Sequence, residues 1–289
     1  MKIGIYQNIF RRCGSFEEQI KRAAAHGFDA MDFSDMESYG VKLFSLSAPE
    51  FERTLTEYGR IASEHGVEIS QTHAPGPPTA SETTPAQMAQ RLELTTRAIE
   101  GAAMMGCPRL VVHPVYPYTS RDFDCPEKTR EVNLDFFSKL CGIARKCGVT
   151  VCLENTPSIR FSIAKVKEVV DFVKELDDPQ LKICLDTGHC TFFQYSPSNA
   201  VRLVGGELLE ALHVHDNKGS ADEHLLPFDG MTDWESFAIA LRDVGYKGVL
   251  SMELQSYPNL PEPLFDDFLD HLRRRISYIA AIADAKKGE

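Results

Sequence analysis

Short apolar runs alternate with amphipathic stretches along the whole chain. The apolar runs are rich in β-branched residues and end in turn-forming residues, as buried strands do. In the stretches between them, apolar positions recur every three or four residues, which is typical of helices with one buried face. The pattern predicts strands at 2–6, 29–33, 67–73, 108–113, 149–154, 181–186, 210–215 and 248–253. It predicts helices near 15–26, 50–65, 84–105, 127–147, 162–176, 197–205, 232–244 and 262–284.

This alternation of strands and helices indicates the fold class. Strands separated by helices run parallel, because each helix returns the chain to the edge where the previous strand began. Eight such units in 289 residues fit a closed (β/α)₈ TIM barrel better than an open sheet. We therefore expect an α/β protein with a single domain over residues 1–289. Its active site should lie at the C-terminal face of the barrel, where the strand-to-helix loops gather.

The last four predicted strands end in groups that bind metals. Glu154, Asp186, His213 and Glu253 lie at or next to their last positions. Side chains alternate across a strand, so each of these groups shares a face with small or polar residues and should point into the barrel. Carboxylates in such a place need a partner cation, because removing them from water is costly. Carboxylates with an imidazole suit one divalent metal ion, Mn²⁺, Mg²⁺, Co²⁺ or Zn²⁺.

Histidines gather on the same face. Three of the nine lie in predicted helices, and the other six lie at strand ends or in the loops just beyond them. A single histidine is more often structural, but six on one face favour metal ligands or substrate contacts. Asn155 and Lys218 flank the ligand positions, and for them a loop-capping role is the alternative. Besides the four ligands, we therefore expect these residues to bind substrate: His73, His113, His189, His215, Asn155 and Lys218.

Net charge and the lengths of the apolar runs limit the kinds of partner that we expect for this protein. The net charge of −11 argues against a nucleic-acid partner, because phosphate binding needs a basic surface. No apolar run approaches the roughly 18 residues of a membrane span. The first strand is too short and too soon interrupted by polar residues to be a secretory signal, so we expect a cytoplasmic protein with no membrane partner. The eight cysteines contain no CxxC pair, and buried thiols are expected instead of disulfides.

Four motifs carry a family resemblance. LENT at 153–156, CLDTGH at 184–189, HVHDN at 213–217 and SMEL at 251–254 occur in the order that resembles the xylose-isomerase-like TIM barrel superfamily. That superfamily contains sugar and sugar phosphate isomerases and epimerases and is related to endonuclease IV. The resemblance covers nearly the whole chain. It implies a small-molecule carbohydrate substrate and assembly into a homodimer or homotetramer.

The same resemblance implies roles for individual residues. One divalent ion would be held by Glu154, Asp186, His213 and Glu253. The two glutamates would also be catalytic, acting as acid and base on opposite faces of the substrate, and His189 would contact a substrate oxygen. The reaction expected is isomerisation or epimerisation of a sugar, sugar phosphate or keto-polyol by proton abstraction next to a carbonyl.

Three alternatives remain open from the sequence. A metal-dependent lyase or dehydratase acting on a keto-sugar or inosose would use the same proton abstraction. An endonuclease IV-like zinc phosphodiesterase is the second, although the acidic charge and a loop at 74–81 without arginine or lysine weigh against it. A sugar-binding or scaffold barrel is the third, since a fold does not determine a function. For the phosphodiesterase, the resemblance places additional metal ligands at His73, His113, His189, Asp222 and His224.

Overall fold

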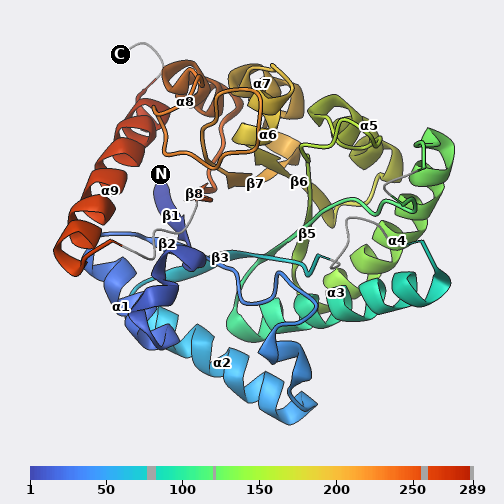
Figure 1. The fold of residues 1–289 in the computed structure, drawn as a ribbon, viewed down its shortest axis with the longest axis horizontal. Coiled ribbons are helices and arrows are strands. Elements are labelled where there is room, and N and C mark those ends of the chain that lie inside the picture. The colour runs from blue at the N-terminus through green and yellow to red at the C-terminus, as the bar shows by residue number, and fades with distance from the viewer. Residues whose placement is uncertain (77–82, 120–121, 255–259, 287–289) are drawn as a thin grey trace.

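The barrel expected from the sequence is the fold of this chain. A computed structural model describes residues 1–76, 83–119, 122–254 and 260–286. Within them, eight parallel strands form a ring that is surrounded by helices (Figure 1), which confirms the (β/α)₈ TIM barrel. The strands are β1 (Lys2–Tyr6), β2 (Ala30–Phe33), β3 (Glu68–His73), β4 (Arg109–Val112), β5 (Thr150–Glu154), β6 (Leu181–Asp186), β7 (Leu209–His213) and β8 (Val249–Met252).

The helices follow the predicted order with small shifts at their ends. The α-helices are α1 (Phe16–Ala25), α2 (Ala48–Glu64), α3 (Pro85–Met105), α4 (Pro126–Cys147), α5 (Val166–Leu176), α6 (Thr187–Phe192), α7 (Pro197–Leu208), α8 (Trp234–Val244) and α9 (Glu262–Asp284), and the 3₁₀ helices are η1 (Gln7–Cys13) and η2 (Lys42–Ser45). The short α6 was not predicted, because six residues are too few to show a helical repeat. None of the helices in the described part of the chain is both long and apolar enough to cross a membrane.

The ring closes at a short joint between its last two strands. In the sheet, β7 and β8 are the two ends of the strand order β7-β6-β5-β4-β3-β2-β1-β8. Val214 bridges them, because its N–H donates to the Ser251 carbonyl at 2.8 Å and its carbonyl accepts from the Glu253 N–H at 3.2 Å. This joint fixes the polypeptide directly beside His213 and Glu253.

Side-chain size separates the inside of the barrel from its outside. A small cluster inside the ring consists of Val111, Cys152, Cys184 and Ala211. The large aliphatic and aromatic residues of the strands face outward and form one core with the helices. This arrangement confirms the predicted alternation, and it also confirms that Cys152 and Cys184 are buried free thiols.

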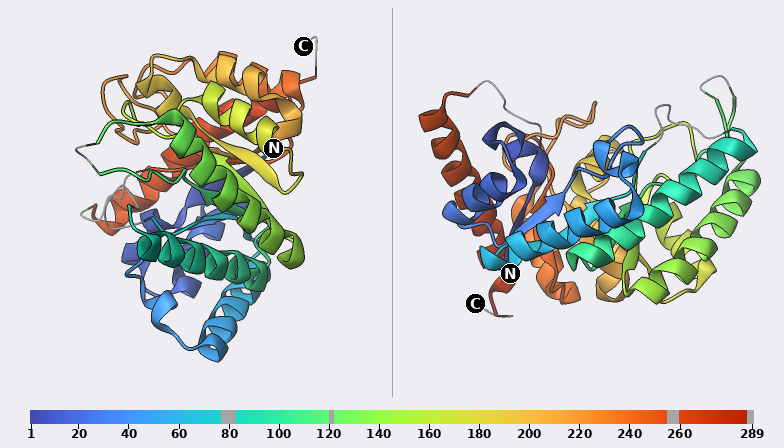
Figure 2. Two further views of the ribbon diagram at one scale, coloured as in Figure 1. Left: turned by 90° about the vertical axis from the view of Figure 1, so that its right-hand side faces the viewer. Right: turned by 90° about the horizontal axis from the view of Figure 1, so that it is seen from below.

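The loops after the strands gather at one end of the ring. In the right-hand view of Figure 2, the N-terminus lies at the opposite end from these loops. Parts of three of them, 77–82, 120–121 and 255–259, are outside the described residues, and so is most of the loop expected to lack basic side chains. The polar strand ends therefore point into the end of the barrel where the loops lie.

Candidate metal centre

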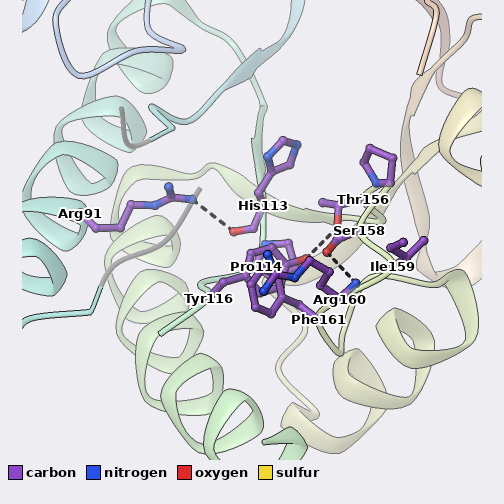
Figure 3. A pocket seen from close by; sticks show the side chains of 10 residues that line it. Arg91, His113, Pro114, Tyr116, Thr156, Ser158, Ile159, Arg160 and Phe161 are labelled. Atoms are coloured by element: carbon purple, nitrogen blue, oxygen red, sulfur yellow. Dashed lines mark hydrogen bonds between the residues drawn. The ribbon is translucent and has the colours of Figure 1, made fainter. Parts of the chain in front are cut away.

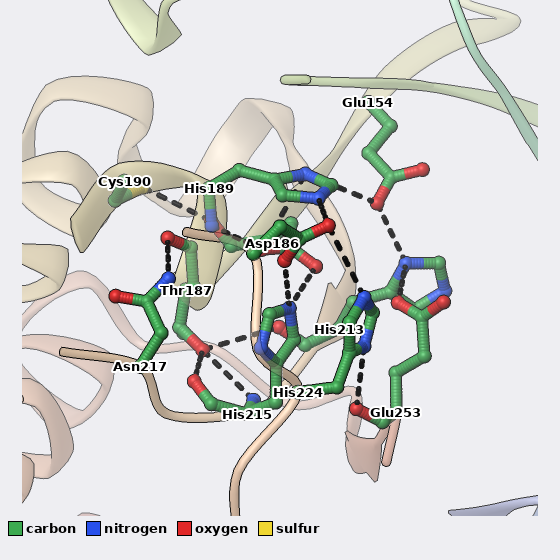
Figure 4. Close-up of polar contacts among 12 residues, drawn as sticks. Glu154, Asp186, Thr187, His189, Cys190, His213, His215, Asn217, His224 and Glu253 are labelled. Atoms are coloured by element: carbon green, nitrogen blue, oxygen red, sulfur yellow. Dashed lines mark hydrogen bonds and ion pairs between the residues drawn. The ribbon is translucent and has the colours of Figure 1, made fainter. Parts of the chain in front are cut away.

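Four side chains from neighbouring strand ends converge at the barrel mouth (Figure 4). One ligand atom each of Glu154, Asp186, His213 and Glu253 lies within 4.8 Å of the others. His213 Nδ1 lies 2.7 Å from Glu154 Oε1 and 3.0 Å from Glu253 Oε2. Glu154, Asp186 and His213 are almost fully buried, whereas 18% of the Glu253 side chain is exposed. The structure thus brings together all four residues named as ligands from the sequence. We call them the strand-held group.

A second set of ligand atoms lies beside the first. His189, His215, Asp222 and His224 also place one atom each within 4.8 Å of one another. Asp222 Oδ2 lies 3.3 Å from both His189 Nε2 and His224 Nε2. The rings of His215 and His224 stack with centroids 4.0 Å apart. We call this set the loop-held group, because Asp222 and His224 belong to the long connection between β7 and α8.

A third set uses a carboxylate of the first. His73 and His113 point their Nε2 atoms at Glu154 Oε2, at 3.2 Å and 2.8 Å. The sets are also joined at Asp186, whose Oδ2 lies 2.9 Å from His215 Nε2. The three groups therefore form one continuous cluster of carboxylates and imidazoles, and it includes each of the additional ligands that the endonuclease IV resemblance implied.

The strand-held group favours its charged forms. Burial opposes ionisation of Glu154, but the facing imidazoles of His213 and His113 hold its pKa well below the usual range. The Glu253 pKa is lowered in the same way, against burial, by His213. Burial likewise opposes the His213 cation, yet the surrounding acidic groups raise its pKa well above the usual value. The site thus needs positive charge, which a divalent ion would supply in place of a proton.

The loop-held group has the same electrostatic character. Burial opposes a charge on His189, but Asp186, Asp222 and Glu154 outweigh it and raise the pKa of His189 to about 10. His224 has a pKa raised to about 9, because its hydrogen bond to Asp222 and the nearby carboxylates outweigh its burial. By contrast, burial raises the pKa of the Cys184 thiol to about 12, so Cys184 stays protonated and is a poor ligand.

One residue below the cluster ends the second predicted strand but was not among the site residues expected from the sequence. Asp32 on β2 is almost fully buried, and its Oδ2 lies 3.1 Å from His213 Nε2. Gln71 on β3 donates to the same oxygen at 2.8 Å. A carboxylate on the far nitrogen of a histidine fixes the ring and its tautomer, which leaves Nδ1 of His213 facing the two glutamates. A charged residue inside a buried strand was the signal that could have revealed this contact.

Another residue outside the expected set, Asp216, anchors the loop that carries Asp222 and His224. The Asp216 carboxylate is fully buried, and its main chain pairs with Leu225 in an antiparallel bridge. It accepts hydrogen bonds of 3.0–3.2 Å from four donors further along the connection: the N–H groups of Phe228, Gly230 and Thr232, and Trp234 Nε1. Asp216 therefore folds the connection back on itself and fixes the loop-held side chains in place.

The remaining predicted substrate contacts have different surroundings. Asn155 is buried, donates to the Asp186 carbonyl at 3.1 Å and accepts from the Asp186 N–H at 2.9 Å, so its amide holds the end of β6. His215 is fully buried and packs on Gly188, where an added Cβ would come within 1.9 Å of the ring. The Lys218 side chain is exposed, and the contact described for this residue is a main-chain donation to Glu223.

Comparison with known proteins gives a family and a set of relatives. The chain matches the model of the family described as xylose isomerase-like TIM barrel over residues 20–275. An uncharacterized protein of Methanocaldococcus jannaschii, MJ1311, is 30% identical over 267 residues, which cover 88% of this chain and 83% of that protein. A D-psicose 3-epimerase of Ruminiclostridium cellulolyticum is 32% identical over 124 residues, 43% of this chain and 40% of the epimerase. A D-psicose 3-epimerase of Agrobacterium fabrum is 22% identical over 88% of this chain and 84% of the epimerase.

Solved structures agree on the fold. A D-tagatose 3-epimerase-like protein superposes with a TM-score of 0.78 at 24% identity, covering 98% of both chains. A D-psicose 3-epimerase crystallised in the presence of D-fructose gives a TM-score of 0.79 at 18% identity, covering 99% of this chain and 100% of the other. The 3-keto-D-glucoside 4-epimerase of E. coli gives 0.73 at 19% identity, covering 95% and 99%.

Proposed function

Because this chain belongs to the xylose isomerase-like TIM barrel family, we propose that it is a divalent-metal-dependent sugar epimerase or isomerase. The observation that carries this proposal is the strand-held group, whose four ligand atoms lie within 4.8 Å of one another at the barrel mouth. The relatives named as D-psicose 3-epimerases support a carbohydrate substrate. The reaction is removal of a proton from the carbon next to a carbonyl group.

The strand-held group fits one divalent ion. Glu154, Asp186 and Glu253 supply oxygen ligands and His213 supplies nitrogen, a mixture that suits Mn²⁺, Mg²⁺, Co²⁺ or Zn²⁺. When bound, such an ion would polarise the substrate carbonyl and stabilise negative charge on its oxygen. Asp32 keeps the His213 ring oriented toward that position, as a carboxylate behind a metal-bound histidine does.

Glu154 and Glu253 are the proposed acid and base. They approach His213 Nδ1 from β5 and from the end of β8, and their lowered pKa keeps them as carboxylates that can accept a proton. Removal of a proton by one carboxylate, and delivery of a proton that the other has taken from solvent to the opposite face, gives an epimer. Return by the same group to the neighbouring carbon gives an isomer. His189 is proposed to contact a substrate oxygen.

Deuterium exchange tests the proposal. The Mn²⁺-loaded protein is incubated in D₂O with D-fructose, D-psicose and D-tagatose, and NMR follows deuterium entering the carbon next to the carbonyl. We expect exchange in the wild type and a loss of about 10²–10⁴-fold in Glu154→Gln and in Glu253→Gln. The control is Glu100→Gln, which changes an exposed glutamate of α3 and should exchange normally. Full exchange in both site variants would rule out their acid–base role, and no exchange by the wild type would count against a ketose epimerase.

A phosphodiesterase is a second candidate, because one observation favours it. The His73–His113–Glu154 set and the loop-held group add two further places for an ion. Elemental analysis after dialysis separates the two functions. One ion per chain favours the epimerase, whereas three zinc ions per chain with hydrolysis of bis(p-nitrophenyl) phosphate favour the phosphodiesterase. Loss of water from a keto-sugar in the same NMR spectra would instead identify the lyase or dehydratase alternative.

A further inference from the structure

A cavity of about 370 Å³ opens beside the metal centre (Figure 3). It lies between the segments that follow β4 and β5. Its size falls within the range of about 300–1,000 Å³ that is usual for small-molecule sites. We call it the ring pocket, and the lining residues used below are His113, Tyr116, Thr156, Ile159 and Phe161.

The ring pocket is continuous with the candidate metal centre. His113 lines the pocket and also points its Nε2 at Glu154 Oε2, 2.8 Å away. The His113 side chain is 40% exposed, so it is accessible to a bound molecule. On the other wall, Thr156 follows Glu154 by two residues and shares a 2.7 Å hydrogen bond with the Tyr116 hydroxyl. A molecule held at the strand-held group can therefore extend past His113 into the pocket.

One wall of the ring pocket is aromatic, and the Arg160 guanidinium, which also lines the pocket, lies 5.7 Å from the centre of the Phe161 ring. Phe161 stacks on Tyr116 with ring centroids 4.6 Å apart and an interplanar angle of 21°, and on Tyr118 at 6.1 Å and 14°. Ile159 stands at the rim with 78% of its surface exposed and adds apolar area to the mouth of the pocket. Aromatic faces pack against aryl rings and against the C–H faces of sugar rings. The pocket thus has the chemistry to receive a ring.

We propose that the ring pocket binds a second ring joined to the reacting sugar, so that a keto-sugar glycoside is a better substrate than a free ketose. This inference rests on the proposed function for the part of the substrate that lies at the metal centre. The second ring is an aryl group or another sugar, since both offer a flat apolar face.

Binding measurements test the ring pocket independently of turnover. Isothermal titration of the Mn²⁺-loaded protein compares methyl β-D-glucopyranoside with phenyl β-D-glucopyranoside and with cellobiose. We expect at least one of the two-ring ligands to bind about tenfold more tightly than the methyl glycoside, because the added ring loses water contact in the pocket. A gain for phenyl alone indicates an aryl glycoside, a gain for cellobiose alone indicates a disaccharide, and either supports the pocket. Equal affinity for all three would overturn it.

Two variants show whether a gain in affinity for two-ring ligands comes from the ring pocket. Phe161→Ala removes the stacked wall, and Ile159→Asp changes a rim residue that is exposed enough to leave folding intact. Both should reduce the gain to about twofold or less. The matched control is Phe123→Ala, since Phe123 is 94% exposed and does not line the pocket. A gain that persists in both Phe161→Ala and Ile159→Asp would show that the ring binds elsewhere. If Phe161→Ala does not fold, Ile159→Asp decides alone.

Exchange measurements separate failure of this inference from failure of the proposed function. Methyl and phenyl 3-keto-β-D-glucosides are compared with free ketoses in D₂O. Exchange on free ketoses without any two-ring advantage in binding would overturn the ring pocket and keep the epimerase. A two-ring advantage without exchange on any keto-sugar would keep the pocket and overturn the epimerase.

Discussion

The strand-held and loop-held groups contain the same kinds of side chain but are built differently. Three members of the strand-held group are the last residues of β5, β6 and β7, and the fourth follows β8. Their spacing is set by strand register, in which Asp186 pairs with His213 and Glu154 pairs with Cys184. The loop-held group instead depends on the short helix α6 and on the connection between β7 and α8. A barrel thus supplies one rigid set of ligands from its sheet and a second set whose position depends on a single loop.

This difference predicts which residues can be changed without disturbing the structure of the centre and which cannot. Backbone pairing on both sides supports each strand end, and the β7–β8 joint fixes Glu253 through the Val214 carbonyl. In the loop, one buried carboxylate, Asp216, replaces that network by accepting from four donors between Phe228 and Trp234. Changes at the strand ends should therefore affect chemistry, whereas changes at Asp216 should affect structure first.

The largest expected effect is on the rate of deuterium exchange, and it is seen by comparing one carboxylate from each group. Glu154→Ala removes a carboxylate that faces three imidazoles, including His213 at 2.7 Å, and should lower exchange by about 10³-fold or more. Asp222→Ala removes the carboxylate between His189 and His224 and should lower exchange by about tenfold or less if one ion suffices. Initial rates of deuterium exchange measure both. Equal losses would show that the two groups act as one multinuclear site.

The second prediction concerns the stability of the loop. Asp216→Ala leaves the four donors between Phe228 and Trp234, and also the Asn217 N–H, without their acceptor. It should lower the free energy of unfolding by about 3–5 kcal/mol. Urea denaturation measures the loss. The control is Asp233→Ala, which removes the N-cap of α8, where the side chain accepts from Ser236 N–H, and should cost about 1 kcal/mol. If the two variants lost the same stability, Asp216 would be an ordinary turn residue and the loop would be held in some other way.

The sequence predicted the strand-held part of this molecule well. Strand period places side chains on alternate faces, and a barrel brings strand ends to one rim, so Glu154, Asp186 and His213 could be placed near one another without coordinates. Cys152 and Cys184, on the same face as the ligands, indeed lie inside the ring. Those inferences needed only local pattern and fold class.

The parts that the sequence did not reveal depend on contacts between distant segments. Asp216 bonds to groups 12–18 residues later, and nothing in its neighbours indicates that the loop folds back on it. Asp32 meets His213 only because β2 and β7 face each other across the barrel interior. The ring pocket likewise joins two loops whose conformation has no repeating pattern. Sequence periodicity describes a single element and says little about such cross-barrel contacts.

A third prediction concerns the protons that an ion displaces. With pKa values of about 10 and 9, His189 and His224 are protonated at pH 7.5 and must each lose a proton to bind a metal. Binding at the loop-held group should therefore release about two protons per ion, and affinity should rise as the pH increases toward 9. Titration calorimetry in buffers of different ionisation enthalpy counts these protons. His224→Gln should reduce the release by about one, and an unchanged count would show that His224 is not protonated before binding.

In the metal-free protein, the same two raised pKa values make the stability of the fold depend on pH. The pKa values of His189 and His224 lie above the ordinary 6.5 in the folded state, so their ion pairs stabilise the fold fully below about pH 6.5. That contribution is lost as the pH rises through 9 and 10. The thermal midpoint of the metal-free protein should fall over this interval, while that of a metal-loaded sample should change less, since the ion has already replaced the protons.

The smallest predicted effect concerns Glu37, which belongs to neither group. It tests whether a side chain outside the two groups keeps a proton in the folded protein. Glu37 accepts a hydrogen bond from the Tyr6 hydroxyl, and burial raises its pKa from 4.5 to about 8. A raised carboxyl pKa means that the folded state keeps a proton that the unfolded chain has lost, so stability declines as the pH rises from 4.5 to 8 and then levels off.

The Glu37→Gln variant should not show this decline in stability. Relative to wild type, the variant should gain about 1–3 kcal/mol between pH 5 and pH 8.5 in urea denaturation. Glu100→Gln, at an exposed site, should show no such trend. If Glu37→Gln follows the wild-type pH profile instead, Glu37 is ionised in the folded protein and does not carry a buried proton.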